Sequence, residues 1–89
     1  MAHYVIGDHA RFEMARRGLS EEVVRAVLDA LDQIIEIRVG RMIMQSRLEM
    51  NVPPKTYLIS VFVDGDRDPQ EVVTAYRTSK VSKYWRQSL

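Results

Sequence analysis

The order of its apolar patterns constrains this chain most: helical spacing comes first, and strand-like segments follow. Apolar side chains recur at helical intervals up to about Leu31. From Gln33 onward the chain consists of short runs rich in Ile, Val and Met, separated by turn residues. Because no helical pattern separates these runs as a parallel crossover would require, they favour an antiparallel sheet. We therefore expect one α+β domain over residues 1–89.

Two helices are expected in the first third of the chain. The first should run from His9 to about Arg17, with Asp8 as its N-cap and Gly18 as the left-handed residue that ends it. The second should run from Glu21 to about Leu31, with Ser20 as its N-cap. Its apolar stripe consists of Val23, Val24, Val27, Leu28 and Leu31.

Four antiparallel strands are expected after the helices. Their ranges are Gln33–Val39, Met42–Glu49, Thr56–Val63 and Glu71–Arg77. The third of them is the most hydrophobic, so we expect it at the centre of the sheet. Both of its faces carry apolar side chains. The set that faces the helices is therefore either Tyr57, Ile59, Val61 and Val63, or Leu58, Ser60 and Phe62.

The two ends of the chain receive simpler predictions. Tyr4–Ile6 is expected to be a short extended lead-in to the first helix. Ser79 is expected to cap a last helix that runs from Lys80 to about Gln87. The complete expected fold is two N-terminal helices packed on a four-stranded antiparallel sheet, followed by a C-terminal helix.

Composition indicates a folded globular protein. The chain has 89 residues, of which 46% are hydrophobic and 28% are charged. It has no cysteine, which excludes disulfides and cysteine-based zinc sites. It also has no signal-peptide pattern and no apolar run near the roughly 18 residues of a membrane span, so a cytoplasmic location is expected. Because the core is small and both faces of the third strand are apolar, we expect a homodimer or a partner on one sheet face.

Charge is distributed unevenly along the chain. The net charge is only +1, but residues 1–75 carry nine cations and twelve carboxylates, a balance of −3. Residues 76–89 carry no carboxylate and four cations, which are Arg77, Lys80, Lys83 and Arg86. This basic end is a candidate surface for an anion such as nucleic acid. The alternative is an ordinary solvated helix face.

Two residues stand out as candidates for chemistry. His9 lies in the first turn of its helix, where the positive end of the dipole favours a neutral imidazole that can act as a base. The alternative is that His9 only packs or caps. Arg77 ends the last strand just before a helix N-terminus, where backbone donors and side chains converge on an anion. Lys80 and Lys83 follow in that helix, and Tyr84 can stack on a base.

The sequence contains no convincing metal site. Asp64, Asp66 and Asp68 have the opening spacing of a calcium-binding loop. However, Pro69 and Ala75 occupy the sixth and twelfth positions, where glycine and a bidentate glutamate are needed. The acidic run is better explained as a turn. We expect no metal and no cofactor.

Two stretches resemble a known family. The run HARFEMARRGLS from His9 to Ser20, together with Val23–Leu28, resembles the opening of the domain-of-unknown-function family four-two-five-eight. Val72–Arg77 resembles its closing strand. The resemblance covers most of the chain. That family is similar to the RelE-like and BrnT-like toxin ribonucleases, whose fold is two helices against an antiparallel sheet.

The resemblance implies a ribonuclease toxin of a toxin–antitoxin pair, with RNA and a small antitoxin as partners. The RNA 2′-OH attacks the adjacent phosphate without a metal, while a base, an acid and cations assist. Carried over position by position, the candidate catalytic residues are His9, Arg77, Thr74 and Tyr84. The candidate RNA- and phosphate-binding residues are Arg47, Lys55, Lys80 and Lys83. The net charge of +1 is lower than in the strongly basic RelE-like toxins.

Three functional hypotheses follow from the sequence. The first is the ribonuclease toxin with its antitoxin. The second is a non-catalytic module on the same fold that binds RNA or protein. The third is a homo-oligomeric structural domain. Since one fold can carry several functions, the positions of the candidate side chains have to decide among them.

Overall fold

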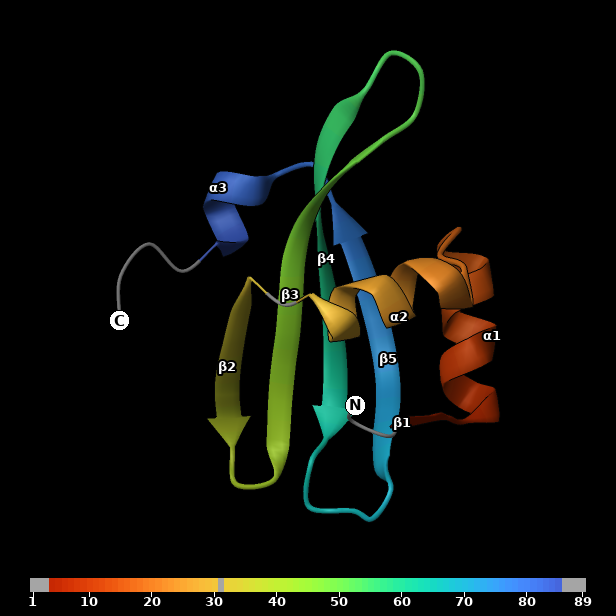
Figure 1. The fold of residues 1–89 in the computed structure, drawn as a ribbon, viewed down its shortest axis with the longest axis vertical. Coiled ribbons are helices and arrows are strands. Elements are labelled where there is room, and N and C mark those ends of the chain that lie inside the picture. Colours follow the sequence, from red (N-terminus) through yellow and green to blue (C-terminus); the bar gives the residue numbers. More distant parts are fainter. Residues whose placement is uncertain (1–3, 31, 86–89) are drawn as a thin grey trace.

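The computed structural model describes residues 4–30 and 32–85, which form an α+β fold around one five-stranded sheet (Figure 1). The strands are β1 (Tyr4–Ile6), β2 (Gln33–Arg38), β3 (Arg41–Met50), β4 (Lys55–Asp64) and β5 (Gln70–Thr78). The helices are α1 (Asp8–Arg16), α2 (Glu21–Asp29) and α3 (Val81–Tyr84). The strand order is β1-β5-β4-β3-β2, so β4 is central, as its hydrophobic sequence predicts.

The prediction of a four-stranded, fully antiparallel sheet is wrong in one respect. Strands β2 to β5 are antiparallel, but the expected lead-in Tyr4–Ile6 is a fifth strand that pairs in parallel with Gln70–Val72 of β5. This pairing satisfies backbone groups of β5 that would otherwise form an open edge. A three-residue segment is too short for its pattern to predict such a pairing.

The register of β4 settles which of its faces meets the helices. Ile59, Val61 and Val63 are fully buried and belong to one cluster with side chains of α1 and α2, and Tyr57 packs against it. We call this side of the sheet the helix face. Since side chains alternate along a strand, Ser60 and Phe62 lie on the opposite side, which we call the cleft face.

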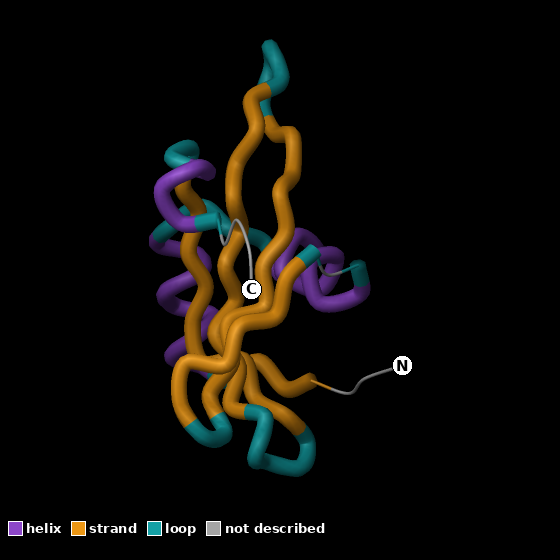
Figure 2. The backbone as a smooth tube through the Cα atoms, turned by 90° about the vertical axis from the view of Figure 1, so that its left-hand side faces the viewer, coloured by secondary structure: helices purple, strands orange, loops and turns teal. Residues whose placement is uncertain are grey.

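The helices occupy different sides of the sheet, as Figures 1 and 2 show together. Helix α2 crosses the helix face and buries Val24, Val27 and Leu28. Helix α1 lies along β5 and buries Ala10 and Met14. The short helix α3 lies on the cleft face, where its Lys83 and Tyr84 adjoin Ser60 and Phe62 (Figure 2). No helix within the described residues is long and apolar enough to span a membrane.

The hairpin of β3 and β4 extends beyond the rest of the molecule (Figures 1 and 2). Its strands pair continuously from Arg41 with Asp64 to Met50 with Lys55. The loop between them has two adjacent prolines, which cannot continue a ladder because they lack a backbone donor.

The helix ends confirm two predicted signals. Gly18 follows α1 with a φ of +70°, the left-handed conformation expected there. The Ser20 hydroxyl accepts a hydrogen bond from the backbone N–H of Val23 (3.2 Å), which confirms it as the N-cap of α2. Helix α2 ends at Asp29; Leu31 lies outside the described residues.

Two predicted caps are wrong. Gly7 is the N-cap of α1, and Asp8 is instead the first helical residue. At that position the positive end of the helix dipole still stabilises its carboxylate. Lys80 rather than Ser79 precedes α3, and its backbone N–H donates to the Thr78 hydroxyl (3.1 Å). The last helix ends at Tyr84, so it is shorter than predicted. Its predicted end, Gln87, lies outside the described residues.

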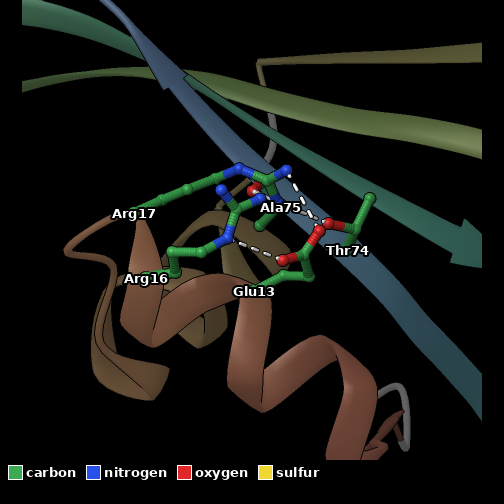
Figure 3. A network of polar contacts seen from close by, with 5 residues as sticks. All are labelled: Glu13, Arg16, Arg17, Thr74 and Ala75. Atoms are coloured by element: carbon green, nitrogen blue, oxygen red, sulfur yellow. Dashed lines mark hydrogen bonds and ion pairs between the residues drawn. The ribbon is translucent and has the colours of Figure 1, made fainter.

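A polar network fastens the end of α1 to the edge of β5 (Figure 3). Arg17 Nη1 donates to the Thr74 hydroxyl (2.9 Å) and to the Ala75 carbonyl (3.3 Å). The Glu13 carboxylate accepts from Arg17 (3.2 Å) and from Arg16 (3.0 Å). The hydrogen bond from Arg16, together with the charges of Arg16 and Arg17, holds the pKa of Glu13 below its usual value.

We predict that Ser20→Ala destabilises the fold and that Ser79→Ala does not. Loss of a side-chain N-cap leaves a helix donor without its partner, so the free energy of unfolding should fall by about 1 kcal/mol. Ser79 caps no helix, and its replacement should change that free energy by less than about 0.5 kcal/mol. Urea denaturation of both variants measures the difference. Equal effects would contradict the assigned caps.

We also predict that Glu13 makes stability depend on acid pH. Because its pKa is lowered in the folded state, its contribution is present above the unfolded-state pKa and is lost as pH falls through the folded-state value. Urea midpoints measured from about pH 6 to about pH 3 should therefore fall less steeply for Glu13→Gln than for the wild type. Glu49→Gln, which removes an exposed carboxylate from β3, is the matched control. Coincident profiles for Glu13→Gln and the wild type would refute the assignment.

Candidate functional site

The cleft face is hollowed beside α3. The cleft has a volume of about 590 Å³ and receives residues from four strands and one helix. They are Ile35, Ile43, Gln45, Ser60, Phe62, Tyr76, Arg77, Thr78, Lys83 and Tyr84. Pairing explains this assembly, because Ile43 lies opposite Phe62 and Gln45 opposite Ser60, and paired residues share a face. A volume of this size lies within the range typical of small-molecule sites.

Aromatic rings form part of the cleft wall. Phe62 and Tyr76 are in edge-to-face contact, with centroids 5.5 Å apart and planes at 73°. Tyr76 is 45% exposed, and Tyr84 of α3 is 52% exposed. Exposed tyrosine rings at a cleft provide surfaces on which a planar ligand can stack.

Cations surround these rings. Lys83 lines the cleft, with its Nζ 5.4 Å from the centroid of Tyr84. Arg17 reaches around the edge of β5, and its guanidinium lies 4.1 Å from the centroid of Tyr76. Within residues 4–30 and 32–85, no carboxylate forms an ion pair with Lys83. Its charge therefore stays available to an anionic ligand.

Polar side chains form the floor of the cleft. The Ser60 hydroxyl donates to Gln45 Oε1 (2.9 Å), and Gln45 Nε2 donates to Gln33 Oε1 (2.8 Å). Gln45 is only 2% exposed. A buried amide of this kind is tolerated because its polar atoms are hydrogen-bonded.

The side chain of Arg77 points away from the other cleft residues. Arg77 pairs with Ile59 of the core, so its side chain lies on the helix face. Its guanidinium lies 5.2 Å from the centroid of Tyr57, and its Nη2 lies 3.7 Å from the position that a Cβ on Gly18 would occupy. The residue borders the cleft, but its charge lies across the sheet from Lys83.

His9 is not brought to Arg77. His9 is exposed in the first turn of α1, whereas Arg77 reaches Gly18, beyond the other end of the same helix. The helical rise from His9 to Arg16 alone is about 10 Å, too far for both groups to hold one phosphate. His9 and Arg77, which the resemblance assigned to one catalytic site, are therefore not brought together on one surface.

The remaining candidate residues occupy separate places. Thr74 accepts its hydrogen bond from Arg17, so its hydroxyl serves the attachment of α1. Arg47 lies 4.2 Å from the Trp85 ring and 3.9 Å from the Asp32 carboxylate, beside α3. Lys55 is exposed at the start of β4 with its Nζ 5.9 Å from the Tyr57 centroid, and Lys80 is exposed just before α3. Of the predicted charged and catalytic side chains, the cleft brings together Lys83 and Tyr84.

Sequence reasoning missed most of the cleft wall. Gln45, Ser60, Phe62 and Tyr76 were not candidates, although the alternation along β4 placed Ser60 and Phe62 on one face. Arg17 was one of several arginines, and nothing local distinguishes it. Only the packing of α1 against the β5 edge carries its guanidinium to Tyr76.

The arrangement favours binding of a planar, anionic ligand. Among the described residues, no group of three His, Asp or Glu side chains is placed to hold a metal ion. The cleft offers ring faces, a buried amide, a hydroxyl and one lysine that has no ion-pair partner among those residues. These groups suit a nucleobase with its phosphate.

Comparisons with known proteins add no relative. No model of a protein family, no curated protein and no solved structure matches this chain. The geometry of the cleft is therefore the basis for a functional proposal.

Proposed function

We propose that this chain binds single-stranded RNA on its cleft face and does so without catalysing a reaction. The observation that carries this proposal is the cleft itself, where Lys83 adjoins the exposed rings of Tyr76 and Tyr84. Stacking on such rings contributes about 1–3 kcal/mol per base. A duplex keeps its bases stacked inside, so only an unpaired strand can use these surfaces.

Local charge supports the proposal better than total charge does. The net charge of +1 does not favour polyanions. Lys80 and Lys83 are close together around α3, and no carboxylate among the described residues forms an ion pair with either. Arg47, beside Trp85, extends this basic region along the same face. A strand that enters the cleft would thus pass cations on its phosphate side.

A second candidate is metal-independent cleavage of the bound RNA. It is favoured by the placement of Lys83 beside Tyr84 in the cleft, since an amine and a phenol can serve a phosphoryl transfer. The separation of His9 from Arg77 argues against the ribonuclease centre that resemblance implied. The RelE-like fold, the toxin role, the antitoxin partner and a homodimer stay predictions.

We predict that Lys83→Glu weakens binding of single-stranded RNA about tenfold, which corresponds to about 1.4 kcal/mol. The change removes a cation from the cleft and places a repelling charge there. The slope of log affinity against log salt should also fall by about 0.7, the value for one phosphate contact. Fluorescence anisotropy with a labelled oligoribonucleotide measures both.

Lys55→Glu is the matched control for this experiment. It makes the same charge change at an exposed lysine whose Nζ lies near Tyr57, away from the cleft. We expect less than about a twofold change in affinity. If both variants lose affinity equally, binding depends on diffuse charge and the cleft proposal fails.

We expect the bound RNA to remain intact. Incubation with excess protein in EDTA, followed by mass spectrometry, should give no products with 2′,3′-cyclic phosphate ends, and induced expression should not arrest growth. Cleavage that is abolished by Tyr84→Phe would overturn the non-catalytic proposal and establish the second candidate. Cleavage that neither Tyr84→Phe nor Lys83→Glu abolishes would overturn both candidates.

A further inference from the structure

The polar floor of the cleft is unusual because its walls are largely apolar. Ile35, Ile43 and Phe62 line the sides, whereas Gln45 and Ser60 face one another across β3 and β4. An apolar pair at these central positions would avoid the cost of burying an amide. The hydrogen bonds from Ser60 to Gln45 and from Gln45 to Gln33 fix the orientation of the amide.

Gln45 and Ser60 each keep one hydrogen-bonding group that these two bonds do not use. A primary amide has two N–H donors, and Gln45 gives one of them to Gln33. The Ser60 hydroxyl uses its proton on Gln45 and keeps its oxygen lone pairs as acceptors. No residue that the structure describes uses the second Gln45 donor or the Ser60 acceptor. The floor therefore offers one donor and one acceptor side by side.

We propose that the cleft receives one unstacked nucleobase, whose hydrogen-bonding edge is read by Gln45 and Ser60. This inference rests on the proposed function and specifies its ligand. The base ring would lie against Tyr76 or Tyr84, and the attached phosphate would lie beside Lys83. A nucleobase edge carries adjacent donors and acceptors, which is the pattern that the floor complements.

The size of the cleft and the fixed positions of its floor residues agree with this ligand. A cleft of about 590 Å³ is large enough for a small planar ligand such as a nucleoside. Gln45 lies on β3 and Ser60 on the central strand β4, so backbone pairing holds both in place before the ligand arrives. Preorganised polar groups lose less free energy on binding than mobile ones.

The test varies the ligand before it varies the protein. Three labelled strands of about eight nucleotides are compared by anisotropy: oligouridine, the same strand with abasic sites, and the same strand with difluorotoluene in place of uracil. Difluorotoluene keeps the ring shape but does not hydrogen-bond well. We expect oligouridine to bind about tenfold more tightly than the difluorotoluene strand, and the abasic strand to bind most weakly.

Protein variants then locate the reading groups. Gln45→Met keeps the length of the side chain without its amide, and should abolish the preference for uracil over difluorotoluene. Ser60→Ala is compared with the wild type on the same two strands, so the test does not depend on Gln45→Met folding. Ser79→Ala, outside the cleft, should keep the full preference.

The outcomes separate this inference from the function on which it rests. Equal binding of the oligouridine and difluorotoluene strands would leave RNA binding by stacking intact and overturn the base-reading inference. A preference that survives both Gln45→Met and Ser60→Ala would also overturn it. Failure of every strand to bind would overturn the proposed function. Binding of uridine monophosphate without binding of RNA would keep the base site and assign it to a free nucleotide.

Discussion

The alternation of side chains along β4 is the constraint on which the rest of the structure depends. As the central strand, β4 pairs with a strand on each side, so its side chains point only to the two faces of the sheet. Each residue therefore has to suit either the helix face or the cleft face. Ile59, Val61 and Val63 form the core beneath α2, while Ser60 and Phe62 face the cleft. A shift of one residue would exchange these two sets and expose the core. The same register thus sets both stability and the chemistry of the cleft.

Arg17 connects the helical layer to the cleft. Its guanidinium bonds the Glu13 carboxylate, the Thr74 hydroxyl and a backbone carbonyl, and it lies over the ring of Tyr76. Several directed hydrogen bonds offset the cost of withdrawing this cation partly from water. The end of α1 is consequently tied to the cleft wall. Arg17 covers part of the Tyr76 ring and Phe62 contacts it, yet Tyr76 remains 45% exposed.

The candidate catalytic residues do not converge on one centre. Resemblance joined His9 and Arg77, but the length of α1 separates these two residues, and the sheet separates the Arg77 charge from Lys83. A shared fold supplies a scaffold, and only converging side chains supply chemistry. In this chain the convergence occurs around Gln45, Ser60 and Tyr84, which fit recognition of a base.

Local pattern in the sequence determined the first two helices, the four antiparallel strands, the cap at Ser20 and the left-handed Gly18, because these depend on neighbours along the chain. The high hydrophobicity of β4 likewise indicated its central place. The parallel pairing of Tyr4–Ile6 depends on an open edge about 65 residues away, which local pattern does not encode. The helix-facing set of β4 was likewise undecided, since both faces carry apolar side chains. Only tertiary packing chose between them. The same packing placed Arg17 against Tyr76 and directed Arg77 away from the cleft.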